Sequence, residues 1–310
     1  MVPGLFYEGR PRTLVSRPEN FYNSGMKIAL IGADGQLGSD LIRALAAHDV
    51  APLYFPAFDV TRPAEVRAEF AALKPGIVIN TAAFHRVDEC EDRIAEAFRV
   101  NAFAVRDLAG ICRDLGATLV HFSTDYVFDG RKTGPYVEDD PPFPLSAYGA
   151  SKLAGEFFLR ALTDRHILIR TCGLYGLAGS REKGTNFVET MIRLADKGGP
   201  IRVVDDQWVT PTSTAELSAR IADLLPLGPT GLFHLTNEGR CTWFGFARAI
   251  FDLLGRTVDL RPVDSRTFGA KARRPAFSVL ENRRAKEIGL PDFSDWRDAL
   301  RDYLRATGRL

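Results

Sequence analysis

Short continuous runs of apolar residues alternate with longer amphipathic stretches in the first half of the chain. The apolar runs span residues 27–31, 51–55, 77–80, 118–122 and 166–170. Runs of this length predict buried strands, whereas the stretches at 36–47, 63–73 and 148–162 have helical spacing. Strands that alternate with helices predict an α/β fold built on a doubly wound parallel sheet.

The second half of the chain has a less regular pattern. Amphipathic stretches at 214–225 and 242–254 flank an apolar run at 232–235, and a closing helix is predicted from Trp296. The segment 130–144 is rich in proline, glycine and acidic residues, which predicts a loop that passes over the substrate.

These patterns divide the chain into two parts. We expect residues 26–170 to form the first domain, with 213–235 returning to it. Residues 171–212 and 236–310 are expected to form a smaller α+β lobe. Residues 1–25 hold three prolines and no sustained period, which predicts a disordered extension or a translation start at Met26. A short arm that packs on a neighbouring molecule is the alternative.

Three glycines follow the first predicted strand at a spacing of three residues. Gly32, Gly35 and Gly38 lie between that strand and the next helix. Glycine permits a tight turn and a close approach to a pyrophosphate, and the helix N-terminus attracts negative charge. Because a strand precedes the loop and a helix follows it, we interpret the loop as a dinucleotide site that includes Gln36 and Leu37.

A tyrosine, a lysine and a threonine form the candidate catalytic set. Tyr148 and Lys152 are four residues apart on a predicted helix and therefore share one face, while Thr124 follows a predicted strand. Free tyrosine has a pKa of about 10, and a nearby ammonium lowers that pKa toward the range useful for proton transfer. Two surface residues on a helix would give the same spacing, but the glycine loop upstream favours a catalytic role.

Two longer strings carry a family resemblance. Residues 123–130, STDYVFDG, and 148–156, YGASKLAGE, resemble the extended short-chain dehydrogenase/reductase superfamily, and within it the dTDP-4-dehydrorhamnose reductase family. The resemblance runs from about Met26 to the C-terminus. It implies a Rossmann-type sheet with a smaller C-terminal substrate lobe, and NAD(P)H-dependent reduction of a nucleotide-activated 4-keto-6-deoxy sugar in dTDP-rhamnose biosynthesis.

The resemblance also implies further cofactor contacts. They are Asp59, Val60, Thr81, Ala82, Ala83 and Asn101, besides Tyr148 and Lys152. Residues 55–58 lack the acidic residue that would bind the ribose 2′-hydroxyl of NAD. The expected cofactor is NADPH, with NADH as an alternative.

The resemblance also implies contacts with the substrate, and at one of these positions the chain departs from the family. They are Ser123, Asp125, Tyr126, Gly173, Asn186, Trp208 and Arg274. Gly173 stands where the family has a tryptophan that contacts the sugar, so one wall of the pocket is missing. Trp208 is a candidate to supply that aromatic surface, with core packing as the alternative. Arg273 or Arg274 is expected to hold the diphosphate, with a structural ion pair as the alternative.

Two other functions stay open at this point. A nucleotide-sugar epimerase shares the fold, and a non-catalytic, NADP-binding regulatory subunit of methionine adenosyltransferase resembles the same branch. A dehydratase is disfavoured because Asp125-Tyr126 replaces the Asp-Glu pair that follows the threonine in dehydratases.

Composition and residue spacing limit the binding partners and the cellular compartment that we expect. The formal net charge is +1, which predicts no attraction to nucleic acid or membrane, and no apolar run approaches the about 20 residues of a membrane span. The four cysteines and five histidines lack metal-ligand spacing, so we expect no metal and a reducing cytoplasm. His121 and His234 are interpreted as packed strand residues. A homodimer is one option for the assembly.

Overall fold

The computed structural model describes residues 27–178 and 184–310. The predicted N-terminal extension, residues 1–25, lies outside the described residues. Within them, no helix is long and apolar enough to cross a membrane.

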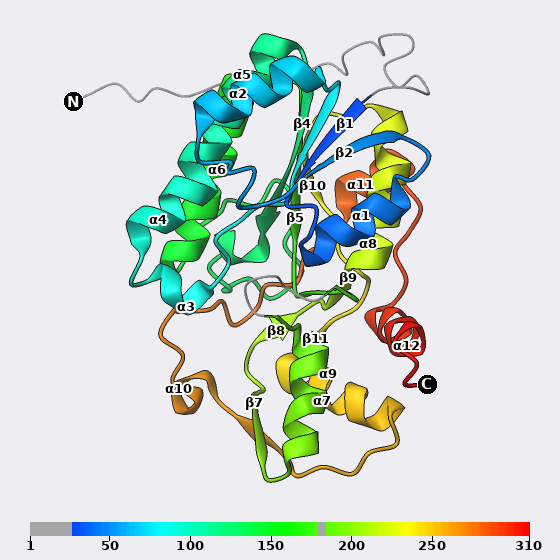
Figure 1. Cartoon of the computed structure of the whole chain (residues 1–310). Helices are drawn as coiled ribbons and strands as arrows, with labels where there is room; N and C mark the ends of the chain where they lie inside the picture. The colour runs from blue at the N-terminus through cyan, green and yellow to red at the C-terminus, as the bar shows by residue number, and fades with distance from the viewer. Residues whose placement is uncertain (1–26, 179–183) are drawn as a thin grey trace, which may run out of the picture.

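A parallel sheet of six strands forms the centre of the upper part of the molecule (Figure 1). Its order is β10-β5-β4-β3-β1-β2, so the chain reverses direction across the sheet between β1 and β3. The strands are β1 Lys27–Ile31, β2 Asp49–Leu53, β3 Ile77–Asn80, β4 Thr118–Thr124, β5 His166–Thr171 and β10 Gly231–His234. Ligands of open parallel sheets bind at such a switch point, beyond the carboxyl ends of the strands.

Helices cover both faces of this sheet because its strands are apolar on both sides (Figure 1). Val66, Leu108 and Leu159 pack on one face, and Leu41 and Ile221 pack on the other. The helices of the first face are α2 Pro63–Leu73, α5 Ala104–Leu115 and α6 Ala147–Leu162, and those of the second are α1 Gln36–Ala44, α8 Thr214–Leu224 and α11 Arg283–Glu287. The predicted Rossmann-type fold is confirmed.

A smaller lobe hangs below the carboxyl ends of the strands (Figure 1). Its core brings together Val188, Phe246, Ile250 and Trp296. Its helices are α7 Phe187–Lys197, α9 Trp243–Leu253, α10 Ser265–Phe268 and α12 Trp296–Ala306, and its strands are β7 Ile201–Val204, β8 Trp208–Val209, β11 Cys241–Thr242 and β12 Leu260–Val263. The remaining short elements are α3 Val87–Cys90, α4 Ile94–Phe98, a π-helix Arg99–Phe103, 3-10 helices Asp125–Val127 and Leu225–Leu227, β6 Leu174–Tyr175 and β9 Thr212–Ser213.

Two strands differ by two residues from the sequence prediction, whereas β5 and β10 differ by one. β2 begins two residues earlier than the apolar run suggests, because it is the half-exposed edge strand and accommodates Pro52. β4 extends through Thr124, so Ser123 and Thr124 belong to the strand, paired with β5, rather than following it.

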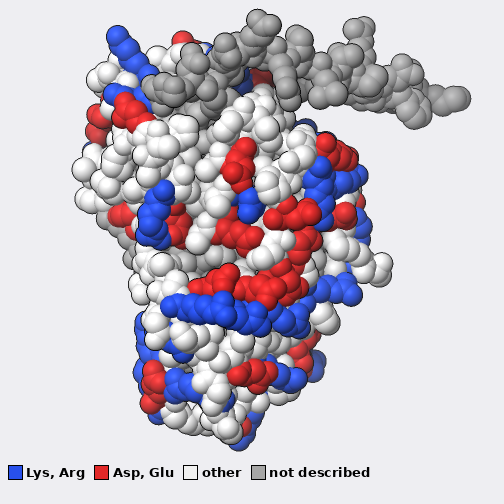
Figure 2. Space-filling model, turned by 90° about the vertical axis from the view of Figure 1, so that its right-hand side faces the viewer, with Lys and Arg blue, Asp and Glu red and all other residues white. Residues whose placement is uncertain are grey.

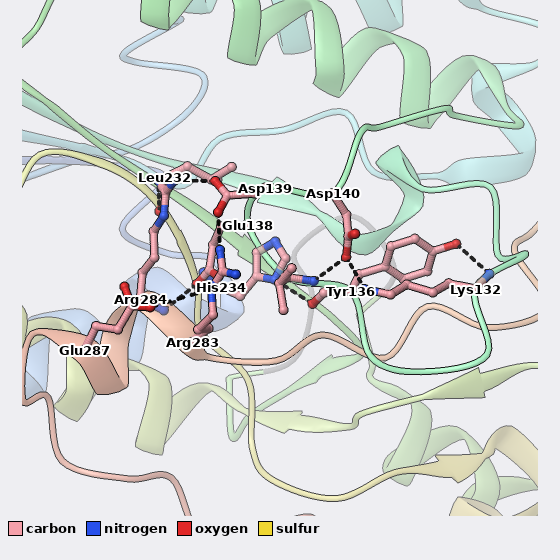
Figure 3. A network of polar contacts seen from close by, with 11 residues as sticks. Lys132, Tyr136, Glu138, Asp139, Asp140, Leu232, His234, Arg283, Arg284 and Glu287 are labelled. Carbon is pink, nitrogen blue, oxygen red and sulfur yellow. Dashed lines mark hydrogen bonds and ion pairs between the residues drawn. The ribbon is translucent and has the colours of Figure 1, made fainter. Parts of the chain in front are cut away.

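The segment 130–144 does not lie over the substrate site as predicted. It packs against β10 and α11 instead, and none of its residues lines the cavity described below (Figure 3). Glu138 of this segment is buried, and its Oε1 accepts hydrogen bonds from the backbone N–H groups of His234 and Arg284, both at 3.1 Å. A buried carboxyl needs such donors, which explains the position of the segment.

Charges of opposite sign lie side by side on the face that carries α8 and α12 (Figure 2). On α12 they form ion pairs between residues three apart, Asp298 with Arg301 and Asp302 with Arg305. Opposite charges thus offset each other on this face, which agrees with the formal net charge of +1 for the whole chain.

Candidate active site

A cavity of about 1810 Å³ lies where the carboxyl ends of the strands meet the smaller lobe. Ile31, Thr81, Thr124 and Thr171 line it from the ends of β1, β3, β4 and β5 or the residue that follows. Side chains of α7, β7 and α9 line the opposite wall. The cavity therefore occupies the switch point of the sheet.

The three predicted catalytic residues meet in this cavity. Thr124 is the last residue of β4, and Tyr148 and Lys152 lie in the first turns of α6. The Ser146 hydroxyl caps α6 by accepting from Gly149 N at 3.2 Å. A Cβ on Gly149 would lie 2.3 Å from the Tyr126 carbonyl oxygen, so glycine lets α6 approach the segment that follows Thr124.

The environment of Tyr148 differs from the sequence prediction. Burial raises its pKa, and a hydrogen bond with Thr124 opposes that shift. The predicted lowering by Lys152 is wrong for this state, because Lys152 Nζ faces another residue: it lies 3.4 Å from His121 Nε2. Burial lowers the pKa of Lys152 to about 8, with Glu156 opposing.

Asp125 is buried directly beside the catalytic threonine. Its Oδ1 accepts from Thr124 Oγ1 at 3.0 Å and its Oδ2 accepts from Cys172 Sγ at 3.2 Å. Burial raises the pKa of Asp125, and these donors, with Ser278, oppose the shift. Tyr126 lines the same wall, edge-on to Tyr148 with ring centroids 5.9 Å apart.

Ser123 lines the cavity, but its hydroxyl is already engaged. It donates to Glu156 Oε1 at 2.5 Å, and Glu156 in turn binds Arg170 through two bonds of 2.9 and 2.6 Å. This buried pair ties α6 to β4 and β5. Ser123 therefore positions α6 in this structure, and its predicted contact with substrate stays a prediction.

The glycine loop forms a cradle that fits a dinucleotide. Gly32 has a φ of +74°, and a Cβ there would lie 2.6 Å from Thr81 Oγ1. A Cβ on Gly38 would lie 2.2 Å from the Gly32 carbonyl oxygen, so Gly38 packs α1 against the loop. Gly35, Gln36 and Leu37 line the cavity at the start of α1, where free N–H groups favour a phosphate.

The other predicted cofactor residues fall into two groups. Asp59, Val60, Thr81, Ala82 and Ala83 line the cavity. Asn101 does not; it is buried on the π-helix, accepts from Phe84 N at 2.9 Å and donates to Ser151 Oγ at 3.0 Å. It braces the loop after β3 against α6.

The predicted substrate residues are also divided. Gly173, Asn186 and Arg274 line the cavity, whereas Trp208 lies outside it on β8, 41 % exposed, under the guanidinium of Arg240. Trp208 therefore does not replace the missing aromatic wall. Asn186 caps α7, accepting from Glu189 N at 3.0 Å.

The two arginines of the 273–274 pair have different surroundings. Arg274 binds Asp88 at 3.0 and 3.2 Å, so the structural alternative holds for it. Arg273 lines the cavity and makes no ion pair within the described part of the chain.

Sequence reasoning missed three residues of this site. Trp243 of α9 lines the cavity, packed against Phe187 at 4.8 Å between ring centroids. Arg202 of β7 is an exposed lining residue, and the single arginine in an otherwise apolar strand was the available signal. His121 was interpreted as packing only, although it lies two residues before Ser123 on the strand that carries Thr124. Among the described residues, no group of three His, Cys, Asp or Glu side chains could hold a metal ion.

Comparison with known proteins now decides the family. The model of the RmlD substrate binding domain matches residues 26–308. The chain belongs to the RmlD substrate binding domain family. It is 40 % identical to the spore coat polysaccharide biosynthesis protein SpsK of Bacillus subtilis over 90 % of this chain and 97 % of that protein.

Other members of the RmlD family carry more specific names. A dTDP-4-dehydrorhamnose reductase of Streptomyces griseus is 41 % identical over 89 % of this chain and 92 % of its own length. The crystal structure of dTDP-4-dehydrorhamnose reductase from Bacillus anthracis in complex with NADP superposes with a TM-score of 0.87. It is 35 % identical, covering 91 % of this chain and 99 % of that one.

Proposed function

We propose that this protein is an NAD(P)H-dependent reductase of a nucleotide-activated 4-keto-6-deoxy sugar, of the dTDP-4-dehydrorhamnose reductase type. The observation that carries the proposal is the meeting of Thr124, Tyr148 and Lys152 in one cavity whose other end is the glycine cradle. The relatives named as reductases support the same chemistry.

The residues of this chain have separate tasks in the reaction. A bound nicotinamide cofactor would supply the hydride for the keto carbon. Tyr148 donates a proton to the oxygen as negative charge develops there, and Thr124 hydrogen-bonds that oxygen by turning its hydroxyl hydrogen away from Asp125 Oδ1. The Lys152 ammonium stabilises the tyrosinate that remains and would bind the nicotinamide ribose. Because these bonds are strongest when the oxygen is most negative, they lower the barrier selectively.

Asp59 supports NADPH as the preferred cofactor. Its Oδ1 accepts from Thr61 N at 2.9 Å and Thr61 Oγ1 at 2.7 Å, and its Oδ2 lies 3.5 Å from Arg62 Nε. The carboxylate is thus engaged with its own turn, while Phe55 and Phe58 line the cavity beside it. At this end of the cavity, no acidic side chain among the described residues is left to bind the ribose 2′-hydroxyl of NAD. NADH is therefore expected to bind more weakly than NADPH.

The exposed lining arginines, Arg202 and Arg273, are the proposed partners of the nucleotide diphosphate. Both line the cavity and neither forms an ion pair with an acidic side chain in the described ranges. Guanidinium groups bind phosphate through paired hydrogen bonds. We assign the sugar ring to the cavity wall that Gly173 and Trp243 share, where the indole offers an apolar surface.

A direct assay tests the function. The purified protein is mixed with NADPH, then with NADH, and with a dTDP-4-keto-6-deoxyhexose, and the absorbance of the reduced cofactor is followed. Rapid oxidation that depends on the sugar is expected, faster with NADPH. Cofactor binding by calorimetry without oxidation would contradict the proposal and favour a regulatory role. We place the enzyme in the cytoplasm, where reduced cofactor is available; a homodimer stays a prediction.

A further inference from the structure

His121 is a buried histidine that the proposed reaction does not use. It lies on β4, only 1 % exposed, and does not line the cavity. Its two ring nitrogens face different neighbours: Nε2 lies 3.4 Å from Lys152 Nζ, and Nδ1 lies 3.3 Å from Asn80 Nδ2. The groups that face the ring are thus Lys152 of α6 and Asn80 of β3, while the neighbouring strand β5 contributes the apolar Leu168.

We propose that His121 is a positioning residue for Lys152: its Nε2 accepts a hydrogen bond from the ammonium and fixes the position of that group in the cavity wall. This role in turnover rests on the proposed function, whereas the contact itself does not.

The chemistry of the ring favours this arrangement. A neutral imidazole has one lone pair, and both neighbouring nitrogens are donors. A charged donor forms the stronger hydrogen bond, so the lone pair belongs on Nε2, opposite Lys152. The proton then lies on Nδ1, where the backbone carbonyl of Asn80 accepts it, and the 3.3 Å contact between Nδ1 and Asn80 Nδ2 is not a hydrogen bond in this tautomer. Burial and Lys152 lower the pKa of His121, while a hydrogen bond with the Asn80 backbone raises it. His121 thus stays neutral and able to accept.

The same contact links Lys152 to the cofactor loop. Asn80 Oδ1 accepts from Ala82 N at 3.1 Å, and Ala82 lines the cavity. His121 therefore stands between Lys152 on α6 and the loop after β3. Glu156, one turn further along α6, also acts on Lys152. It raises the pKa of Lys152, whereas burial lowers it.

A spectroscopic experiment tests the contact without any turnover. The full chain, labelled with ¹⁵N in its histidines and free of cofactor, is studied by NMR near neutral pH, and His121→Gln assigns the His121 signals among the five histidines. We expect a protonated Nδ1 and an unprotonated Nε2. A proton on Nε2 would overturn the proposal, because that nitrogen could not accept from an ammonium.

A pH series tests the positioning role. Lys152 has a lowered pKa and acts as the cation, so activity falls as the pH rises through that pKa. His121→Leu removes an acceptor that favours the ammonium, and should move the alkaline limb of kcat/KM down by about one pH unit. His121→Gln keeps an acceptor oxygen, so the alkaline limb of kcat/KM should return to its wild-type pH. His234→Gln, the matched control in another buried strand position, should leave it unchanged.

The outcomes separate the two proposals. A folded His121→Leu protein with the wild-type alkaline limb would overturn the positioning role. If the wild type does not reduce the keto sugar, the same pH series is run on NADPH binding by calorimetry. In that case, an NMR spectrum with a protonated Nδ1 and an unprotonated Nε2 would support the contact between His121 and Lys152, although the proposed reaction had failed.

Discussion

Thr124 donates its hydroxyl hydrogen to Asp125 Oδ1 at 3.0 Å, so the catalytic threonine is held by a buried carboxyl. Asp125 forms no ion pair with a basic side chain in the part of the chain that the structure describes. Its neutral donors, Thr124 and Cys172, leave burial as the dominant influence, which raises the pKa of Asp125. Ionised Asp125 is therefore a source of instability that the site retains.

Asp125→Asn should stabilise the fold and slow the reaction. The raised pKa means that the wild type loses stability as the pH rises from the unfolded value through the folded one. The variant has no charge to bury, so its unfolding free energy should exceed that of the wild type by about 1 kcal/mol at alkaline pH, with a smaller gain under acidic conditions. Denaturant unfolding at two pH values measures this.

The control for that prediction is Asp302→Asn on the exposed face of α12. It removes the same charge without burial and should show no pH-dependent gain. A gain of equal size in both variants would contradict the explanation from burial. Turnover of Asp125→Asn should fall because the amide places an N–H group beside Thr124.

Tyr148→Phe should lose most turnover and keep cofactor affinity. The change removes only the hydroxyl that donates the proton, which contributes about 10²–10⁴-fold in rate. Rates come from the absorbance assay and affinity from calorimetry with NADPH. Tyr136→Phe, a buried tyrosine outside the cavity, is the control and should retain its rate. Near-full activity of the Tyr148 variant would exclude the proton-donor role.

Most of the fold could be predicted from the sequence, because apolar runs specify strands that are buried on both faces. β1, α2 and β3 have the predicted bounds, and Thr124, Tyr148 and Lys152 line one cavity. Local pattern could not predict contacts between distant segments. The position of segment 130–144 depends on buried Glu138, and the direction of Lys152 Nζ depends on His121.

Single-residue substitutions in the substrate wall were harder to interpret from sequence. Gly173 was read as a lost aromatic contact, but it also has a φ of +57°. The backbone conformation thus favours glycine there, and an aromatic residue of the cavity wall, Trp243, lies on a helix far along the chain. Neither backbone angle nor long-range packing can be read from a local string.

Gly173→Ala should therefore destabilise the protein. Its φ of +57° is unfavourable for a residue with a Cβ, and the new Cβ would lie 3.2 Å from Pro211 Cα. The expected loss is about 1–2 kcal/mol of unfolding free energy. Gly134→Ala is the matched control, since its Cβ would meet no described atom within 4 Å. Equal stability of the two variants would show that position 173 tolerates a side chain.

Arg202→Ala should weaken nucleotide-sugar binding without changing the chemical step. Arg202 faces the cavity from β7, and its register partner on β12, Arg261, is paired with Asp259 and does not line the cavity. Loss of one charge-assisted contact to phosphate should raise KM for the sugar about tenfold and leave kcat unchanged. Arg261→Ala removes the same charge from the neighbouring strand and should leave both constants unchanged. A similar rise in KM for both variants would show that long-range charge, rather than contact with the diphosphate, makes Arg202 important.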